Sequence, residues 1–315
     1  MEKKLTILDI ARLSGVGKST VSRVLNQDPR VNAQTRARVE AVIAEHDFVP
    51  SKSARAMRSQ SQQVVGIVVS RLDSSSENQA VRGMLETLYQ RGYDAVLMES
   101  KFSPAKVSEH LAVLERRGVD GIILFAFNDL DYAAMAPLRE KLVLMARERP
   151  GFSSVCYDDE GAVRAVLEHL RGLGIDQVAY LGVERSDLTT GLRRHQAYLD
   201  YCEALGRTPH SALGDLSLHS GYRLAAELVT PSTQALVCAS DTLAIGAAKY
   251  LQEQGRTDIL VSGLGSNPML TFLFANALNL DFGYKDAGIL AARQLLDQIE
   301  EGQAPRATIA PCQPL

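Results

Sequence analysis

From residue 64 onward, short apolar runs alternate with stretches whose apolar residues recur at helical spacing. The apolar runs lie at 64–70, 94–98, 121–127 and 142–146, and then at 177–183, 235–239 and 259–263. Between the first two runs, Val81, Met84, Leu85 and Leu88 mark one face of a helix. A chain that alternates strands and helices in this way forms parallel sheets with helices on both faces. Because the series starts again after Tyr157, the sequence predicts two similar α/β lobes.

The first 50 residues follow a different pattern, which predicts three short helices. Thr6 and Asp9 form an N-terminal capping signature for the first helix, which ends at a glycine turn. A second helix is predicted over 18–26, and Asn32 is predicted to cap a third over 33–46. Two helices joined by a tight turn that contains glycine, with a third helix for support, are typical of a helix-turn-helix unit.

The charge of the chain is unevenly distributed between these two regions. Residues 1–60 contain 11 Lys or Arg and 6 Asp or Glu, a net charge of +5. The remaining residues contain 23 basic and 31 acidic side chains, a net charge of −8. A compact basic unit joined to an acidic body favours a polyanionic partner for the basic unit.

The start of the second predicted helix carries short polar side chains. An α-helix fits the major groove of DNA, and polar residues near its N-terminus can reach the base edges. We therefore expect Lys18, Ser19 and Thr20 to read bases, and Ser22 and Arg23 to lie nearer the DNA backbone. The alternative is a three-helix interaction module that binds no DNA.

Residues 15–20, GVGKST, also resemble the end of a phosphate-binding P-loop. That motif requires glycine five positions before Gly17, but Arg12 stands there. The preceding element is predicted to be a helix, whereas a P-loop follows a strand. These two departures exclude a nucleoside triphosphatase of this class.

Residues 5–25, together with TRARV at 35–39 and FVPS at 48–51, resemble the DNA-binding head of the LacI/GalR family of transcriptional regulators. The resemblance implies a homodimer that binds double-stranded operator DNA and represses transcription. It also adds Thr6 and Asn26 to the expected DNA contacts.

The resemblance further implies a hinge helix that forms on the operator and places an apolar wedge in the minor groove. The wedge position is Met57, where the family usually has leucine, and further hinge contacts are expected at Lys52, Ala54 and Arg55.

The implied fold is an all-α helix-turn-helix head and a hinge helix, followed by a two-lobed, periplasmic-binding-protein-like core of parallel sheets. The expected boundaries are 1–50 for the head, 51–63 for the hinge and linker, and 64–315 for the effector-binding and dimerisation core. Within the core, the first lobe is expected at about 64–157 and 290–315, and the second lobe at about 158–289.

Ligands of parallel sheets bind beyond the carboxyl ends of the strands. Polar side chains gather at these positions, although loops are often polar without forming a site. We expect the effector-binding residues to be Arg71, Asp73, Ser74, Glu77, Ala126, Arg147, Asp187, Thr189, Thr190, Arg194, Asp241, Thr242 and Tyr284.

Three arginines of this set, Arg71, Arg147 and Arg194, follow different strands and would converge on one cleft. The arginine fork matches the geometry of phosphate, and the carboxylates and hydroxyls of the set suit sugar hydroxyls. The residues by themselves predict a phosphorylated sugar. The resemblance implies trehalose 6-phosphate, a phosphorylated disaccharide, with Arg71 and Arg147 as phosphate partners. It places Arg194 in the family's effector-contact motif RxxG[FYW], with alanine in place of the glycine.

The sequence lacks the motifs of the common α/β enzymes. It contains no GxGxxG after the first strand, no GxSxG and no HExxH. Its six histidines show no metal-ligand spacing, and its four cysteines lie too far apart for a CxxC pair. We therefore expect neither an enzyme nor a protein with a metal or cofactor.

The N-terminal residues lack the apolar run of a signal peptide, and no apolar stretch approaches the length of a membrane span. We therefore expect a cytoplasmic protein without a membrane partner. The sequence also lacks the leucine-repeat tail of a tetramer, which favours a dimer.

Three alternatives stay open at this point. The effector could be another phosphorylated sugar, or it could act as a corepressor that strengthens DNA binding. Less in keeping with the basic head, the chain could be a sugar-binding protein without a role on DNA.

Overall fold

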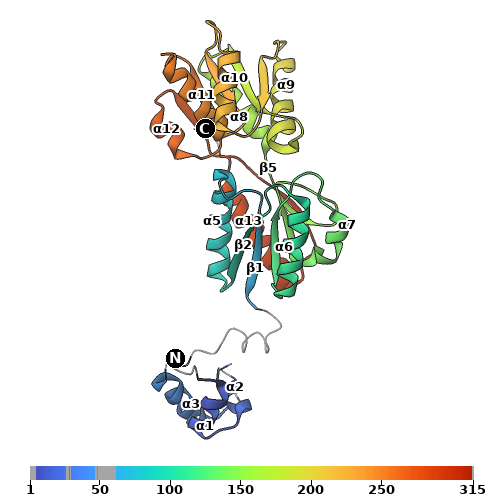
Figure 1. Cartoon of the computed structure of the whole chain (residues 1–315), viewed down its shortest axis with the longest axis vertical. Helices are drawn as coiled ribbons and strands as arrows, with labels where there is room; N and C mark the ends of the chain where they lie inside the picture. Colours follow the sequence, from blue (N-terminus) through green and yellow to red (C-terminus); the bar gives the residue numbers. More distant parts are fainter. Residues whose placement is uncertain (1–4, 26–27, 29, 47, 49–61, 314–315) are drawn as a thin grey trace. The chain divides into compact units, whose positions relative to one another are not determined.

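The computed structural model describes residues 5–25, 28, 30–46, 48 and 62–313. The chain divides into two compact units, Met1–Gln62 and Gln63–Leu315 (Figure 1).

The first unit contains the three predicted helices, which are α1 (Ile7–Ser14), α2 (Lys18–Leu25) and α3 (Ala33–Glu45). Thr6 and Asp9 form the predicted capping box, because each side chain accepts a hydrogen bond from the other residue's backbone N–H. Gly15 ends α1 in the left-handed conformation, with φ 64°. The helices bury Ile10, Val21 and Val39 completely. This arrangement confirms the helix-turn-helix prediction.

The first lobe of the second unit is built on a sheet of six parallel strands (Figure 1). Its spatial order is β11-β5-β4-β3-β1-β2. The strands are β1 (Val64–Val69), β2 (Asp94–Glu99), β3 (Gly121–Phe125), β4 (Leu142–Met145), β5 (Ser153–Tyr157) and β11 (Ala307–Ala310). The register pairs Val65 of β1 with Ala95 of β2 on one side and with Gly121 of β3 on the other.

Helices cover both faces of this sheet, as the alternating pattern predicts. The helices are α5 (Ser75–Gln90) and α13 (Tyr284–Glu301) on one face, and α6 (Pro104–Arg116), α7 (Tyr132–Met135) and the 3₁₀ helix η1 (Ala136–Lys141) on the other. Successive strand residues point to opposite faces. Ile67 therefore packs in the cluster with α5 and α13, whereas Val68 packs in the cluster with α6.

The second lobe repeats this plan with a five-stranded parallel sheet in the order β10-β9-β8-β6-β7. Its strands are β6 (Val178–Val183), β7 (Ser211–Gly214), β8 (Ala235–Cys238), β9 (Leu260–Leu264) and β10 (Ala277–Leu280). Its helical elements are α8 (Asp159–Gly172), η2 (Leu188–Arg193), α9 (Arg194–Ala204), α10 (Leu218–Leu228), α11 (Asp241–Glu253) and α12 (Pro268–Leu273). The two parallel-sheet lobes confirm the predicted fold class.

Three backbone segments lie side by side where the chain passes between the lobes. The N–H of Asp158, after β5, donates to the carbonyl of Ala310 at 3.2 Å. The N–H of Gln313 donates to the carbonyl of Asp281 at 2.9 Å, which adds the segment that leads into α13. All of α13 belongs to the first lobe, so the chain re-enters that lobe at Tyr284, before the expected position 290.

The apolar pattern missed the central strand β5 and three of the four strands at the sheet edges, whereas it predicted the fourth edge strand, β2. Strands β7, β10 and β11 have four residues each and lie at sheet edges, where most of their residues are partly exposed. Such strands lack a continuous apolar run, so periodicity does not mark them. Pro137 lies at the start of η1, where its missing N–H leaves no hydrogen bond unmade.

Glycines permit close contacts between helices in both lobes. A Cβ atom added to Gly288 of α13 would lie 1.9 Å from the carbonyl oxygen of Ala80 in α5. In the second lobe, a Cβ at Gly246 of α11 would lie 2.0 Å from the carbonyl oxygen of Leu218 in α10. Each position therefore requires glycine, because the neighbouring atom is backbone and cannot turn aside.

We expect Gly288→Ala to lower the free energy of unfolding by about 1–3 kcal/mol, because the added methyl group forces α5 and α13 apart. Urea unfolding followed by circular dichroism measures the change. The matched control is Gly172→Ala at the end of α8, where a Cβ would have no neighbour within 4 Å. Equal stabilities of the two variants would contradict the close-packing argument.

Candidate functional site

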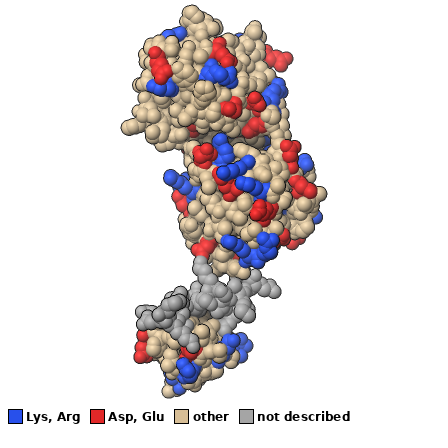
Figure 2. All heavy atoms as spheres, viewed as in Figure 1, with Lys and Arg blue, Asp and Glu red and all other residues tan. Residues whose placement is uncertain are grey.

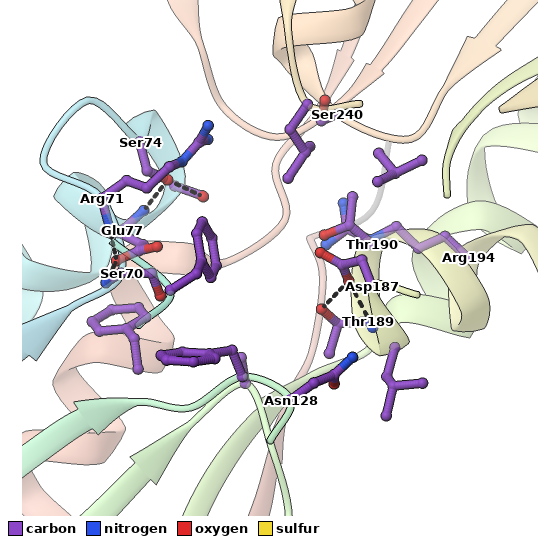
Figure 3. Close-up of a pocket in the computed structure, with 18 of the residues that line it drawn as sticks. Ser70, Arg71, Ser74, Glu77, Asn128, Asp187, Thr189, Thr190, Arg194 and Ser240 are labelled. Carbon is purple, nitrogen blue, oxygen red and sulfur yellow. Dashed lines mark hydrogen bonds between the residues drawn. The ribbon is translucent and has the colours of Figure 1, made fainter. Parts of the chain in front are cut away.

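A cavity of about 500 Å³ lies between the two lobes, at the carboxyl ends of strands from both sheets (Figure 3). Ser70, Ala126 and Arg147 follow β1, β3 and β4 of the first lobe, whereas Glu184 and Ser240 follow β6 and β8 of the second. This is the position at which parallel α/β sheets bind ligands.

The structure brings twelve of the thirteen expected effector-binding residues to this cavity. They are Arg71, Ser74, Glu77, Ala126, Arg147, Asp187, Thr189, Thr190, Arg194, Asp241, Thr242 and Tyr284. Asp73 is not among the residues that line it. The Asp73 side chain is 82% exposed and lies 3.6 Å from Nε of Arg71, because it leaves the loop after β1 toward solvent.

Arg194 is almost completely buried in the wall of the cavity. Its Nε donates to Oδ1 of Asp159 at 2.7 Å, and Nη1 donates to the carbonyl of Ala239 at 2.6 Å. Nη2 lies 3.5 Å from the Tyr284 hydroxyl, and the guanidinium carbon lies 4.1 Å from the centre of the Phe282 ring. Arg194 thus contacts both segments by which the chain enters and leaves the second lobe.

The charge of this buried guanidinium is maintained by its partners. Burial by itself lowers the pKa of Arg194, but the contacts with Tyr284 and Asp159 raise it above its ordinary value. Sequence reasoning did not identify Asp159 or its buried ion pair, because an acidic residue at the start of a helix also serves as a favourable surface charge.

Two acidic residues of the cavity are buried, and burial is the main cause of the shift in both. Burial raises the pKa of Glu77 to about 7, although the backbone N–H groups of Ser70 and Arg71 donate to its carboxylate. Burial also raises the pKa of Asp241 to about 6, against a hydrogen bond from the N–H of Asn267. Oδ1 of Asp241 is buried without a hydrogen-bond partner among the described residues.

The loop after β6 presents hydroxyl groups to the cavity. Oδ1 of Asp187 accepts hydrogen bonds from the backbone N–H and the hydroxyl of Thr189, at 2.9 and 3.0 Å. In Figure 3, Asp187, Thr189 and Thr190 lie on one side of the cavity, and Arg71, Ser74 and Glu77 lie on the other.

Sequence reasoning missed the apolar part of the lining. Phe102, Phe125, Phe127 and Tyr157 contribute aromatic surface, and the rings of Phe102 and Phe127 meet edge to face at 5.6 Å. Phe125, Phe127 and Tyr157 belong to apolar stretches, where they cannot be distinguished from ordinary core positions. Phe102 stands alone between polar residues, where a single aromatic residue gives no signal. Asn128, Ser186 and Ser240 also line the cavity and carried no signal beyond the polarity of a loop.

On the first unit, α2 exposes several of the expected DNA contacts. Lys18, Ser19 and Arg23 are exposed, whereas Thr20 and Ser22 are partly buried. Thr6 is exposed, and its hydroxyl takes part in the capping box. Figure 2 shows basic side chains at the surface of this unit. Asn26, Lys52, Ala54, Arg55 and Met57 lie outside the described residues.

Among the described residues, no three or more His, Cys, Asp or Glu side chains form a group that could hold a metal ion. No helix in this part of the chain is long and apolar enough to cross a membrane.

Two family models match the chain almost end to end. Residues 6–51 match the bacterial regulatory proteins of the lacI family, and residues 62–312 match the periplasmic binding proteins and sugar binding domain of the LacI family. The chain belongs to the LacI family. It is therefore a DNA-binding transcriptional repressor of that family, which confirms the prediction that it is not an enzyme.

Individual relatives cover nearly all of the chain. It is 51% identical over 311 residues, 99% of each chain, to the HTH-type transcriptional regulator TreR of Escherichia coli (strain K12). A solved structure of the trehalose repressor from Escherichia coli matches with a TM-score of 0.77 and 47% identity, covering 79% of this chain and 98% of the other.

A solved lac repressor dimer, bound to operator and the anti-inducer ONPF, has the same fold. The match has a TM-score of 0.87 at 23% identity, and it covers 99% of this chain and 97% of the other.

We expect Glu77→Gln to remove a pH dependence of stability. The pKa of Glu77 is about 7 in the folded protein, whereas an exposed glutamate has a pKa of 4.5. The folded state therefore binds the proton more tightly than the unfolded state. Stability therefore falls as the pH rises from about 4.5 to 7, by up to about 3 kcal/mol. Urea unfolding at pH 5 and pH 8 measures the free energies of unfolding. The unsubstituted protein should lose stability between pH 5 and pH 8, whereas the glutamine variant should lose less, so the difference between them shifts in favour of the variant at pH 8. A constant difference between the two proteins would contradict the buried carboxyl group.

Proposed function

We propose that this chain is a homodimeric, cytoplasmic repressor of a sugar-utilisation operon that serves trehalose, and that trehalose 6-phosphate releases it from its operator. The observation that carries the effector assignment is the pairing of Arg71 and Arg147 at one cavity with aromatic and hydroxyl groups. Such a lining suits a phosphorylated sugar, because arginine binds phosphate and aromatic faces pack against sugar rings.

Arg71 is the strongest candidate for the phosphate contact. Its Nε is buried and has no hydrogen-bond partner among the described residues, although the exposed carboxylate of Asp73 lies 3.6 Å away as an ion pair. The guanidinium therefore still has a donor to offer at the cavity. The relatives named for trehalose regulation favour trehalose 6-phosphate over other phosphorylated sugars. Arg194 already donates hydrogen bonds to Asp159 and to the carbonyl of Ala239. Its role is therefore to shape the wall of the cavity as well as to contact the ligand.

For the head, we propose that two copies of α2 enter successive major grooves of a pseudo-palindromic operator. Lys18, Ser19 and Thr20 would read bases, and Ser22 and Arg23 would contact the backbone. The hinge contacts at Lys52, Ala54, Arg55 and Met57, and the contact at Asn26, stay predictions.

We expect Arg71→Ala to raise the effector concentration at half-release about 10- to 100-fold, because hydrogen bonds to charged groups contribute about 1.5–3 kcal/mol. The measurement is the fluorescence anisotropy of a labelled operator, titrated at fixed salt with trehalose 6-phosphate and with unphosphorylated trehalose. Arg164→Ala, at an exposed arginine of α8, is the control. Release of the Arg71→Ala variant at the unsubstituted concentration would refute the phosphate assignment. Tighter operator binding with the sugar phosphate would instead indicate a corepressor.

We expect Ser19→Ala to relax base preference at one position of each half-site by about 1–3 kcal/mol. Arg23→Ala should weaken binding to all sequences alike and reduce the salt dependence by about one phosphate contact. Both effects can be measured on operators with single base-pair changes at several salt concentrations. A uniform loss for Ser19→Ala would reassign Ser19 to the backbone.

A further inference from the structure

Asn128 connects an arginine of the cavity to the opposite lobe. Its Oδ1 accepts a hydrogen bond from Nη1 of Arg147 at 2.5 Å, within the first lobe. Its Nδ2 donates to the backbone carbonyl of Ser186, which follows β6 in the second lobe. In Figure 3 the Asn128 side chain points toward the side of the cavity that carries Asp187 and Thr189.

The two bonds determine how the amide group of Asn128 is oriented. A guanidinium only donates hydrogen bonds and a carbonyl only accepts them, so Oδ1 must face Arg147 and the NH₂ group must face Ser186. Asparagine thus joins a donor to an acceptor, which neither aspartate nor an aliphatic residue can do. The side chain is partly buried at the edge of the cavity, where both partners are within reach.

The backbone beside both residues is in an unusual conformation. Ala146, which precedes Arg147, has φ 67°, and Asp129, which follows Asn128, has φ 64°. Residues other than glycine remain in the left-handed region only where the surroundings hold them there. The conformations of the loops after β3 and β4 therefore hold Asn128 and Arg147 in the positions in which their side chains form a hydrogen bond.

We propose that Asn128 transmits the occupancy of Arg147 to the second lobe. This inference rests on the proposed function, in which an anionic group of the effector binds at Arg147. An anion that holds Arg147 in place also holds Asn128 against the carbonyl of Ser186. The bridge then stabilises the arrangement of the lobes that the effector favours. Asn128 is a positioning residue, and its effect is on release from the operator rather than on effector affinity alone.

The test separates release at saturation from the concentration required for release. The operator affinity of the whole chain is measured by fluorescence anisotropy, once without trehalose 6-phosphate and once at a saturating concentration. The quantity compared is the affinity without the sugar phosphate divided by the affinity at saturation. We expect Asn128→Ala to reduce this ratio by about three- to tenfold, the contribution of one hydrogen bond. Loss of a simple binding contact would shift the midpoint of release and leave the ratio at saturation unchanged.

Asn128→Asp is the matched variant. It keeps the acceptor for Arg147 but replaces the donor to Ser186 with a second acceptor, so we expect the same reduced ratio as for Asn128→Ala. If Asn128→Asp gives the same ratio as the unsubstituted protein, Asn128 only orients Arg147. That result would overturn the proposal. An unchanged ratio in both variants would overturn it as well.

The unsubstituted protein in the same titration tests the proposed function separately. If trehalose 6-phosphate does not release it, the effector assignment fails, and the role of Asn128 fails with it. If trehalose 6-phosphate releases the unsubstituted protein and both variants give the same affinity ratio as that protein, the effector assignment stands. In that case only the role of Asn128 is refuted.

Discussion

The ion pair between Arg194 and Asp159 lies at the point where the lobes of the core are joined. Both side chains are almost fully buried, so each charge depends on the other for compensation. Asp159 begins the first helix of the second lobe, and Phe282 and Tyr284 mark the return to the first lobe. Arg194 contacts all three, and it also lines the cavity. The guanidinium therefore joins the lining of the cavity to the segments that connect the two lobes.

The remainder of the cavity depends on the parallel sheets. Because the carboxyl ends of parallel strands lie at one edge of a sheet, two such sheets can present loops from many strands to a shared space. The close contacts at Gly288 and Gly246 pack neighbouring helices tightly within each lobe. Asn128 and Ser186 extend this arrangement, since they form a contact between lobes that includes an arginine of the cavity.

Much of the fold could be predicted from local patterns. The capping box at Thr6 and Asp9, the glycine turn at Gly15 and the cap at Asn32 are short-range features, and the structure contains all three. Most of the central strands were predicted, because they are buried on both faces and read as apolar runs. The central strand β5 was not, because Ser153 and Ser154 leave it only a short apolar run. The short edge strands β7, β10 and β11 could not be predicted in this way, because exposure at the edge of a sheet permits polar residues. The longer edge strand β2 was predicted, because residues 95–98 form an apolar run.

The sequence by itself determined the helix-turn-helix head, the α/β character of both lobes and the strand ends at which polar residues gather. These features follow from spacings of a few residues and from the rule that places ligands at the carboxyl ends of parallel strands. Only the tertiary structure decided that Asp73 faces solvent, that Asp159 neutralises Arg194, and that Asn128 reaches across to Ser186. Each of these outcomes depends on residues far apart in the chain, whose distances are set by the packing of whole lobes and not by any local pattern.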